Sequence, residues 1–235
     1  MFYELKQQLR MWSLSSIARA VVKDRLTYLS PKKLMRIQRA LKETKDVPGD
    51  ILEFGVALGG SGIIFAHHIG ESRRFLGFDV FGMIPPPTSE KDDAVSKERY
   101  ETIKSGASRG IGNDGYYGYK MDLISEVKAS FARHSVPVDD KCIILYKGLF
   151  EDTWPTVIVK AISLVHIDCD WYDPVRFCLN ACADKLGEGG IIIIDDYHDY
   201  GGCRTAVDEF IAERRNFTFE DGANPLLKKR PSLAH

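Results

Sequence analysis

Residues 53–62 read EFGVALGGSG and join an apolar run, DILEFGVA, to a helix-like segment, SGIIFAHHIG. The stretch therefore predicts a strand, a glycine-rich turn and a helix. In open α/β sheets, glycines after a strand let the backbone approach a ligand, and the next helix offers free N–H groups. The glycine spacing is GxxxGGxG rather than GxGxxG, and no GK[ST] follows it. The turn therefore predicts a site for a nucleoside without a diphosphate.

The next predicted strand, RRFLGFDV, strengthens this interpretation because it ends on an acid, Asp79. Asp79 lies a little under twenty residues past the turn, where a carboxylate can accept hydrogen bonds from both ribose hydroxyls.

Strands and helices alternate through the rest of the chain. The further strands expected are CIILYKG, ISLVHID and GGIIIIDD, each apolar nearly throughout, with helices such as PVRFCLNACADKL between them. Such strands are typical of a parallel sheet covered on both faces. The last two strands, FTFED and PLLKKR, are separated by GAN and predict an antiparallel hairpin at one edge. The fold class is therefore α/β, with a doubly wound, Rossmann-like, mostly parallel seven-stranded sheet.

Two segments stand apart from this alternation. Residues 1–47 predict a helical segment broken near Ser30-Pro31, since proline suits a first helical turn, and we expect it to cap the pocket or form a dimer contact. Residues 48–235 would form the main domain. Within it, 82–120 is long for a connection, and its glycines, charges and tyrosines favour a lid over a pocket, with a disordered segment as the alternative.

The composition excludes several classes of protein. The chain has 235 residues, 44% hydrophobic and 28% charged, and a net charge of −1, which argues against nucleic-acid binding. No apolar run approaches the roughly 20 residues that span a bilayer, and the N-terminus lacks the apolar core of a signal peptide. The five cysteines form no CxxC pair, so we expect free thiols and a cytoplasmic location.

Carboxylates follow two of the buried strands at the point where each ends. VHIDCDWYDP (165–174) carries Asp168 and Asp170, and GGIIIIDDYHDY (189–200) carries Asp195 and Asp196. Because adjacent parallel strands end at the same edge of the sheet, we expect these acids to face one another. Crowded carboxylates resist ionisation unless a cation intervenes, and oxygen ligands favour Mg²⁺ or Mn²⁺. Such an ion lowers the pKa of a bound hydroxyl and orients neighbouring oxygens.

Two residues beside these acids have simpler expected roles. Asp173 precedes Pro174 and predicts a helix cap. His166 lies within its strand, where alternation is expected to turn it away from the neighbours of Asp168 or into the core, as a satisfied buried histidine rather than a ligand.

Five motifs together resemble the macrocin O-methyltransferase (TylF-like) family, class I S-adenosylmethionine (SAM)-dependent enzymes that methylate sugars of antibiotics and other glycoconjugates. They are ILEFGVALGGS, GFDVFGMIPPP, YKGLFEDTWP, VHIDCDWYDP and GGIIIIDDYHDYGGCRTAVDEF, in order between about residues 48 and 212. The resemblance implies the class I methyltransferase fold with SAM as the cofactor.

The resemblance also implies roles for particular residues. Asp168, Asp195 and Asp196 would bind the metal. Asp170 is the first candidate for the base and His198 the second, with Asp168 also at the catalytic centre. The expected cofactor contacts are Glu53, Gly55, Val56, Ala57, Gly59, Ser61, Asp79, Gly148, Leu149, Phe150 and Asp168. The chain departs from the family at Cys169, where the family usually has a small residue such as glycine. The resemblance therefore does not define the substrate pocket.

The expected function is that of a metal-dependent O-methyltransferase that acts on a hydroxyl of a sugar or glycosylated metabolite and works as a homodimer. One alternative is the same chemistry on a catechol or other phenol. The other is a non-catalytic SAM- or nucleoside-binding module, which would have no use for four acids at one edge. The glycine spacing makes a nicotinamide-dependent oxidoreductase a remote third.

Overall fold

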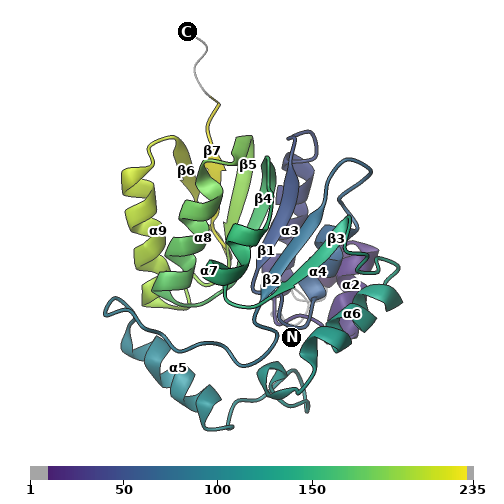
Figure 1. Ribbon diagram of the computed structural model, residues 1–235, viewed down its shortest axis with the longest axis vertical. Coiled ribbons are helices and arrows are strands. Elements are labelled where there is room, and N and C mark those ends of the chain that lie inside the picture. Colours follow the sequence, from purple (N-terminus) through teal and green to yellow (C-terminus); the bar gives the residue numbers. More distant parts are fainter. Residues whose placement is uncertain (1–9, 232–235) are drawn as a thin grey trace.

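The computed structural model describes residues 10–231, which form a seven-stranded sheet between two layers of helices (Figure 1). The strand order is β3-β2-β1-β4-β5-β7-β6, and the first five pair in parallel while β7 runs antiparallel to both β5 and β6. The chain order reverses between β1 and β4, which is where open α/β sheets bind ligands. The predicted fold class, including the edge hairpin, is confirmed. The strands are β1 (Asp50–Phe54), β2 (Phe75–Asp79), β3 (Ile143–Lys147), β4 (Ile162–Ile167), β5 (Leu186–Ile194), β6 (Phe217–Glu220) and β7 (Leu226–Lys229).

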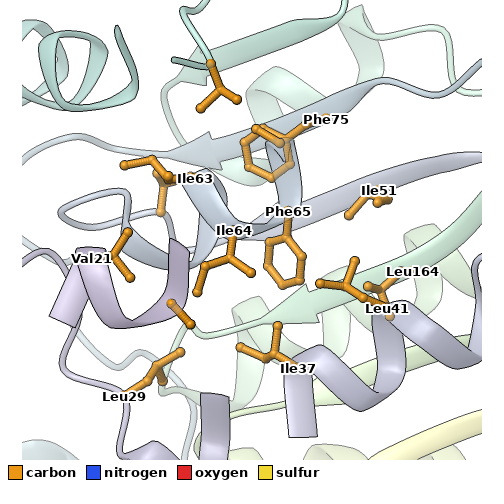
Figure 2. Close-up of a cluster of buried hydrophobic side chains, with 14 of the residues drawn as sticks. Val21, Leu29, Ile37, Leu41, Ile51, Ile63, Ile64, Phe65, Phe75 and Leu164 are labelled. Carbon is orange, nitrogen blue, oxygen red and sulfur yellow. The ribbon is translucent and has the colours of Figure 1, made fainter. Parts of the chain in front are cut away.

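The first hydrophobic core lies between the sheet and the layer of α2, α3, α4 and α6. Figure 2 shows Phe65 of α4 between Phe75 of β2 and Ile37 of α3, and all three side chains are fully buried. The N-terminal helices therefore share a core with the sheet. The helices of this layer are α2 (Ser16–Lys23), α3 (Pro31–Glu43), α4 (Gly60–Ala66) and α6 (Leu123–Arg133).

The second core lies on the opposite face, under α7, α8 and α9. An aromatic stack runs across three neighbouring strands, with Phe54 4.8 Å from Phe78 and Phe78 4.9 Å from Tyr146, measured between ring centroids. Offset aromatic pairs of this kind add to the stabilisation that comes from burial alone. The helical segments on this face are α7 (Phe150–Thr153), η2 (Trp154–Thr156), α8 (Tyr172–Ala183) and α9 (Gly201–Glu213).

The predicted break at Ser30-Pro31 is confirmed. The Ser30 hydroxyl accepts a hydrogen bond from the Lys33 backbone N–H, and Pro31 is the first residue of α3. Proline suits this position because the first N–H groups of a helix have no intrahelical acceptor. The break directs α3 along the sheet, where Leu34, Ile37 and Leu41 enter the first core.

Residues 82–120 contain more regular structure than the sequence predicted. They form α5 (Ala94–Lys104) and a short 3₁₀ turn, η1 (Tyr117–Tyr119), beyond the lower edge of the sheet in Figure 1. The helix escaped prediction because it buries only Ser96 and Ile103, so its sequence carries little amphipathic pattern. Among residues 10–231, no helix combines the length and apolarity that a bilayer crossing requires.

Candidate active site

A cavity of about 630 Å³ opens at the carboxyl ends of the parallel strands. Its walls come from the turns after β1, β2, β4 and β5, from residues 26–29 before α3, and from the segment 82–120. The glycine-rich turn and the acids after β4 and β5 thus line a single space, as the topology predicted.

The glycine-rich turn requires Gly55 for steric reasons. Its φ is +94°, and a Cβ at this position would overlap the carbonyl oxygen of Asp168. Glycine reaches this backbone conformation at little cost, while other residues are strained in it. The turn therefore runs closely against the acid-bearing end of β4.

Asp79 lies at the end of β2, beside the turn. Its Oδ2 accepts a hydrogen bond from the Ala57 N–H at 2.8 Å, and its Oδ1 accepts one from the Phe81 N–H at 2.6 Å. Burial raises the pKa of Asp79, and these N–H groups oppose that shift by stabilising the carboxylate. The residue is both held in place and present on the cavity wall.

The structure brings most of the predicted cofactor contacts to the cavity and leaves three outside its lining. Those on the wall are Gly55, Val56, Ala57, Ser61, Asp79, Leu149, Phe150 and Asp168. Glu53 instead lies fully buried beneath the turn and binds His166. Gly59 precedes α4, where an added Cβ would lie 2.9 Å from the Phe131 ring, and Gly148 begins the turn after β3. These three residues shape the turns rather than line the cavity.

Three acids gather where β4 and β5 end. Asp168, Asp195 and Asp196 each offer a carboxylate oxygen, and these atoms all lie within 4.8 Å of one another. Burial and then the neighbouring carboxylates raise the pKa of Asp168 and of Asp196 well above its usual range. Clustered oxygen donors with little solvent access suit a hard divalent cation such as Mg²⁺. The residues present therefore fit the metal that the sequence predicted.

Asp170 lies beside this cluster with a left-handed backbone, at φ +59°. Its N–H donates to Oδ2 of Asp196 at 3.1 Å, and the residue lines the cavity. Burial, opposed by the Arg99 guanidinium and reinforced by Asp195, raises the pKa of Asp170 to about 7. Asp170 is thus the carboxylate next to the three-acid cluster on the cavity wall.

His198, the second candidate for the base, lies away from this centre. Its Nε2 is 2.9 Å from Oδ1 of Asp221 and 3.1 Å from the carbonyl oxygen of Gly222, and it is not part of the cavity wall. The turn after β5 directs it towards the loop between β6 and β7. The structure therefore does not bring His198 to the acids.

Asp173 also differs from expectation. It lies inside the first turn of α8, and its Oδ2 accepts a hydrogen bond from the Thr88 hydroxyl at 2.7 Å. The acceptor for the first N–H of this helix, that of Tyr172, is Oδ1 of Asp92, from a segment 80 residues away. The prediction that Asp173 caps α8 was wrong, because the cap comes from the long segment over the cavity.

Sequence reasoning missed Lys33, which reaches the acids from α3. Its Nζ lies 2.7 Å from Oδ2 of Asp195, in a residue pair separated by 162 positions in the chain. Nothing in the sequence around Lys33 marks it out from its neighbour Lys32.

His166 is buried in the core, as one of the two expected placements had it, but this position also brings it next to the acids rather than away from them. Its Nδ1 is 2.9 Å from Oε1 of Glu53, and its Nε2 is 3.8 Å from Oδ1 of Asp195. Burial is the largest single influence and lowers the pKa of His166, but Asp195 and Glu53 together outweigh it and raise the pKa to about 10. The histidine therefore connects the cluster with the acid beneath the glycine-rich turn.

Residues 88–93, here called the strap, tie the 82–120 segment to the helices that follow the acids. Asp92 binds the first N–H of α8, and Oδ2 of Asp93 accepts the first N–H of α9, from Gly201, at 2.9 Å. Lys91 adds an ion pair with Glu209 at 2.6 Å. The segment also brings Arg99 to the cavity, with its guanidinium carbon 5.7 Å from the centre of the Tyr116 ring.

A glycine-rich turn at the switch point of this seven-stranded sheet, with an antiparallel strand between β5 and β6, defines a class I SAM-dependent methyltransferase. The solved structure of the O-methyltransferase NovP has the same fold, with a TM-score of 0.74 and 21% identity, covering 97% of this chain and 99% of that one.

Comparison with protein families gives a narrower assignment. The family model for macrocin-O-methyltransferase (TylF) matches residues 18–218. The chain belongs to this family of O-methyltransferases.

Two curated relatives show the degree of similarity. Demethyldecarbamoylnovobiocin O-methyltransferase from Streptomyces niveus is 27% identical over 80% of this chain and 68% of its own length. Mycinamicin III 3''-O-methyltransferase from Micromonospora griseorubida is 28% identical over 78% of this chain and 69% of its own length.

Proposed function

We propose that the protein transfers the methyl group of SAM to a hydroxyl of a sugar or glycosylated metabolite, with a divalent metal held by Asp168, Asp195 and Asp196. The observation that carries this proposal is the three-carboxylate cluster within 4.8 Å, on the same cavity as the glycine-rich turn. The relatives are named as O-methyltransferases of novobiocin and mycinamicin intermediates, which supports a glycosylated acceptor.

The cofactor would lie along the cavity wall that the turn provides. Asp79 would bind the ribose, and Leu149 and Phe150 would contact the adenine. The methionine end would pass Gly55 towards Asp168, because only a glycine allows these two backbones to approach so closely. This arrangement would direct the sulfonium methyl towards the acids.

Methyl transfer is an in-line displacement in which the acceptor oxygen bonds to the methyl carbon as the carbon–sulfur bond breaks and S-adenosylhomocysteine leaves. A bound metal would supply acidity to the acceptor hydroxyl and orient its oxygens. Asp170 would take the proton from that hydroxyl, since it is the carboxylate beside the cluster on the cavity wall. The segment 82–120 would exclude water from this end of the cavity and position the acceptor.

A catechol or other phenol is the second candidate for the acceptor. Several aromatic side chains line the cavity and could pack against a phenol ring: Tyr28, Tyr116, Tyr117, Trp171 and Tyr200. Four of these five are tyrosines, whose hydroxyls could equally bind sugar oxygens, so an acceptor screen must separate the two classes.

The test combines calorimetry with turnover. SAM and Mg²⁺ or Mn²⁺ are titrated into the wild type and into Asp168→Asn and Asp196→Asn, and S-adenosylhomocysteine release is measured with glycosides and catechols. We expect both variants to retain the fold and lose metal binding and turnover. His198→Asn is the matched control, since this polar residue lies close in sequence but off the cavity wall.

Other outcomes of that test would reject parts of the proposal. Turnover that survives chelation of the metal would show that the reaction does not need a metal. SAM binding without turnover of any acceptor would favour the non-catalytic module.

We also propose that the protein is cytoplasmic and that it forms a homodimer through its N-terminal helices. Sedimentation of the intact chain would test the dimer.

A further inference from the structure

Lys33 is bound at the edge of the acid cluster by three acceptors. Its Nζ lies 2.7 Å from Oδ2 of Asp195, 3.1 Å from the backbone oxygen of Asp195 and 3.1 Å from Oδ2 of Asp199. An ammonium group has three N–H donors, so each of them can be used here. The Lys33 side chain is only 17% exposed and that of Asp195 only 6%, so solvent screens this pair weakly.

The two oxygens of Asp195 have different surroundings. Oδ2 is taken by Lys33, whereas Oδ1 is buried and has no hydrogen-bond partner among residues 10–231. Nε2 of His166 lies 3.8 Å from Oδ1, which is too far for a hydrogen bond. Lys33 therefore fixes the carboxylate by one oxygen and leaves the other available to a cation.

We propose that Lys33 is the built-in counter-ion of the metal site: it positions Asp195 and, through its charge, weakens the affinity of the cluster for a divalent cation. This inference rests on the proposed metal site. A fixed positive charge beside a buried acid cluster stabilises the cluster when no metal is present, and it repels a metal that binds there. Lys33 is thus a positioning residue that would keep the protein folded and the metal exchangeable.

The test is titration of Mn²⁺ and Mg²⁺ by calorimetry, with thermal unfolding measured in the presence of a chelator and of metal. Lys33→Met removes the charge and keeps an unbranched side chain, Lys33→Gln keeps a hydrogen-bond donor, and Lys33→Arg keeps the charge. Lys32→Met is the matched control because Lys32 is the exposed neighbour on the same helix and its loss changes the net charge equally.

We expect Lys33→Met and Lys33→Gln to bind metal about tenfold or more tightly than the wild type, on the scale of Coulomb interactions near a protein surface. Both should unfold at a lower temperature in chelator and gain more from metal. Lys33→Arg and Lys32→Met should stay within about threefold of the wild-type affinity, since the charge near the metal is unchanged in each.

The possible results separate this inference from the proposed function. If the wild type binds metal and both neutral variants bind it equally or more weakly, the counter-ion role is wrong and the metal site stands. If only the neutral variants bind metal, Lys33 occupies the site as its cation and the inference is supported. If no variant binds metal, the metal part of the proposed function fails as well.

Discussion

Gly55 shows how one residue can link the cofactor turn to the acids. A Cβ there would overlap the backbone of Asp168, and its φ of +94° would strain any other residue. We expect Gly55→Ala to weaken SAM binding by about tenfold or more and to lower the free energy of unfolding by about 2 kcal/mol or more. Calorimetry and denaturant unfolding would measure both.

Gly106→Ala is the control for that substitution. Gly106 also has a positive φ, +80°, but nothing lies within 4 Å of a Cβ built on it. This variant should carry the backbone strain alone and leave SAM affinity unchanged. Equal loss of SAM affinity in both variants would contradict the close approach of the two turns.

His166 is a buried residue whose replacement should destabilise the fold much more than replacement of an exposed histidine. It is fully buried between Glu53 and Asp195, so its removal leaves two buried carboxylates with less compensation. We expect His166→Ala to lower the free energy of unfolding by about 3–5 kcal/mol. The exposed His68→Ala should cost less than about 1 kcal/mol, and a similarly small loss for His166→Ala would disprove the network.

At the scale of single residues, the sequence was informative where chemistry and position coincide. Acids that end buried strands predicted the cluster, because parallel strands end at one edge of the sheet. Lys33 could not be predicted, since its partner lies 162 residues away and the packing of α3 on the sheet decides the contact. The burial of His166 was predicted, but its partners Glu53 and Asp195 were not, because side-chain alternation gives a face of the sheet and does not give the residues found there.

The two acids of the strap, Asp92 and Asp93, connect the 82–120 segment to the first residues of α8 and α9. Asp93 binds Gly201 at the start of α9 and also Ser96 in its own helix, α5, each at 2.9 Å. Asp93→Ala should therefore cost about 1–2 kcal/mol of unfolding free energy, as lost helix caps do, and loosen residues 82–120. Hydrogen exchange of that segment should accelerate while the strands keep their protection.

Glu98→Ala is the control at this scale, since Glu98 is an exposed residue of the same helix. Unchanged hydrogen exchange in Asp93→Ala would show that the strap does not hold the segment.

The secondary-structure elements differ in how well the sequence predicts them. The apolar strands and α3, with its Ser30 cap, were predictable from the sequence. In contrast, α5 is held largely by contacts that its own sequence pattern does not reveal.

For the whole molecule, cofactor binding should stabilise both cores together, because the cavity lies at the end of the sheet that the two cores share. At about 100 times its dissociation constant, SAM should add about 2.7 kcal/mol to the free energy of unfolding. For a chain of 235 residues this corresponds to a rise of about 5–10 °C in the unfolding temperature. Scanning calorimetry would show one transition that moves as a whole, and a split transition would mean that the two layers unfold separately.

The place of β7 has a consequence for how the protein is made. Residues 226–229 pair with β5, the strand that Asp195 and Asp196 follow, yet they are synthesised some thirty residues after it. Until they leave the ribosome, the outer edge of β5 exposes unpaired backbone groups on four consecutive isoleucines, Ile191 to Ile194. Exposed apolar strand edges recruit other chains. A chain that is truncated before Leu226 and released should therefore depend on chaperones to stay out of aggregates, although it contains every acid of the cluster.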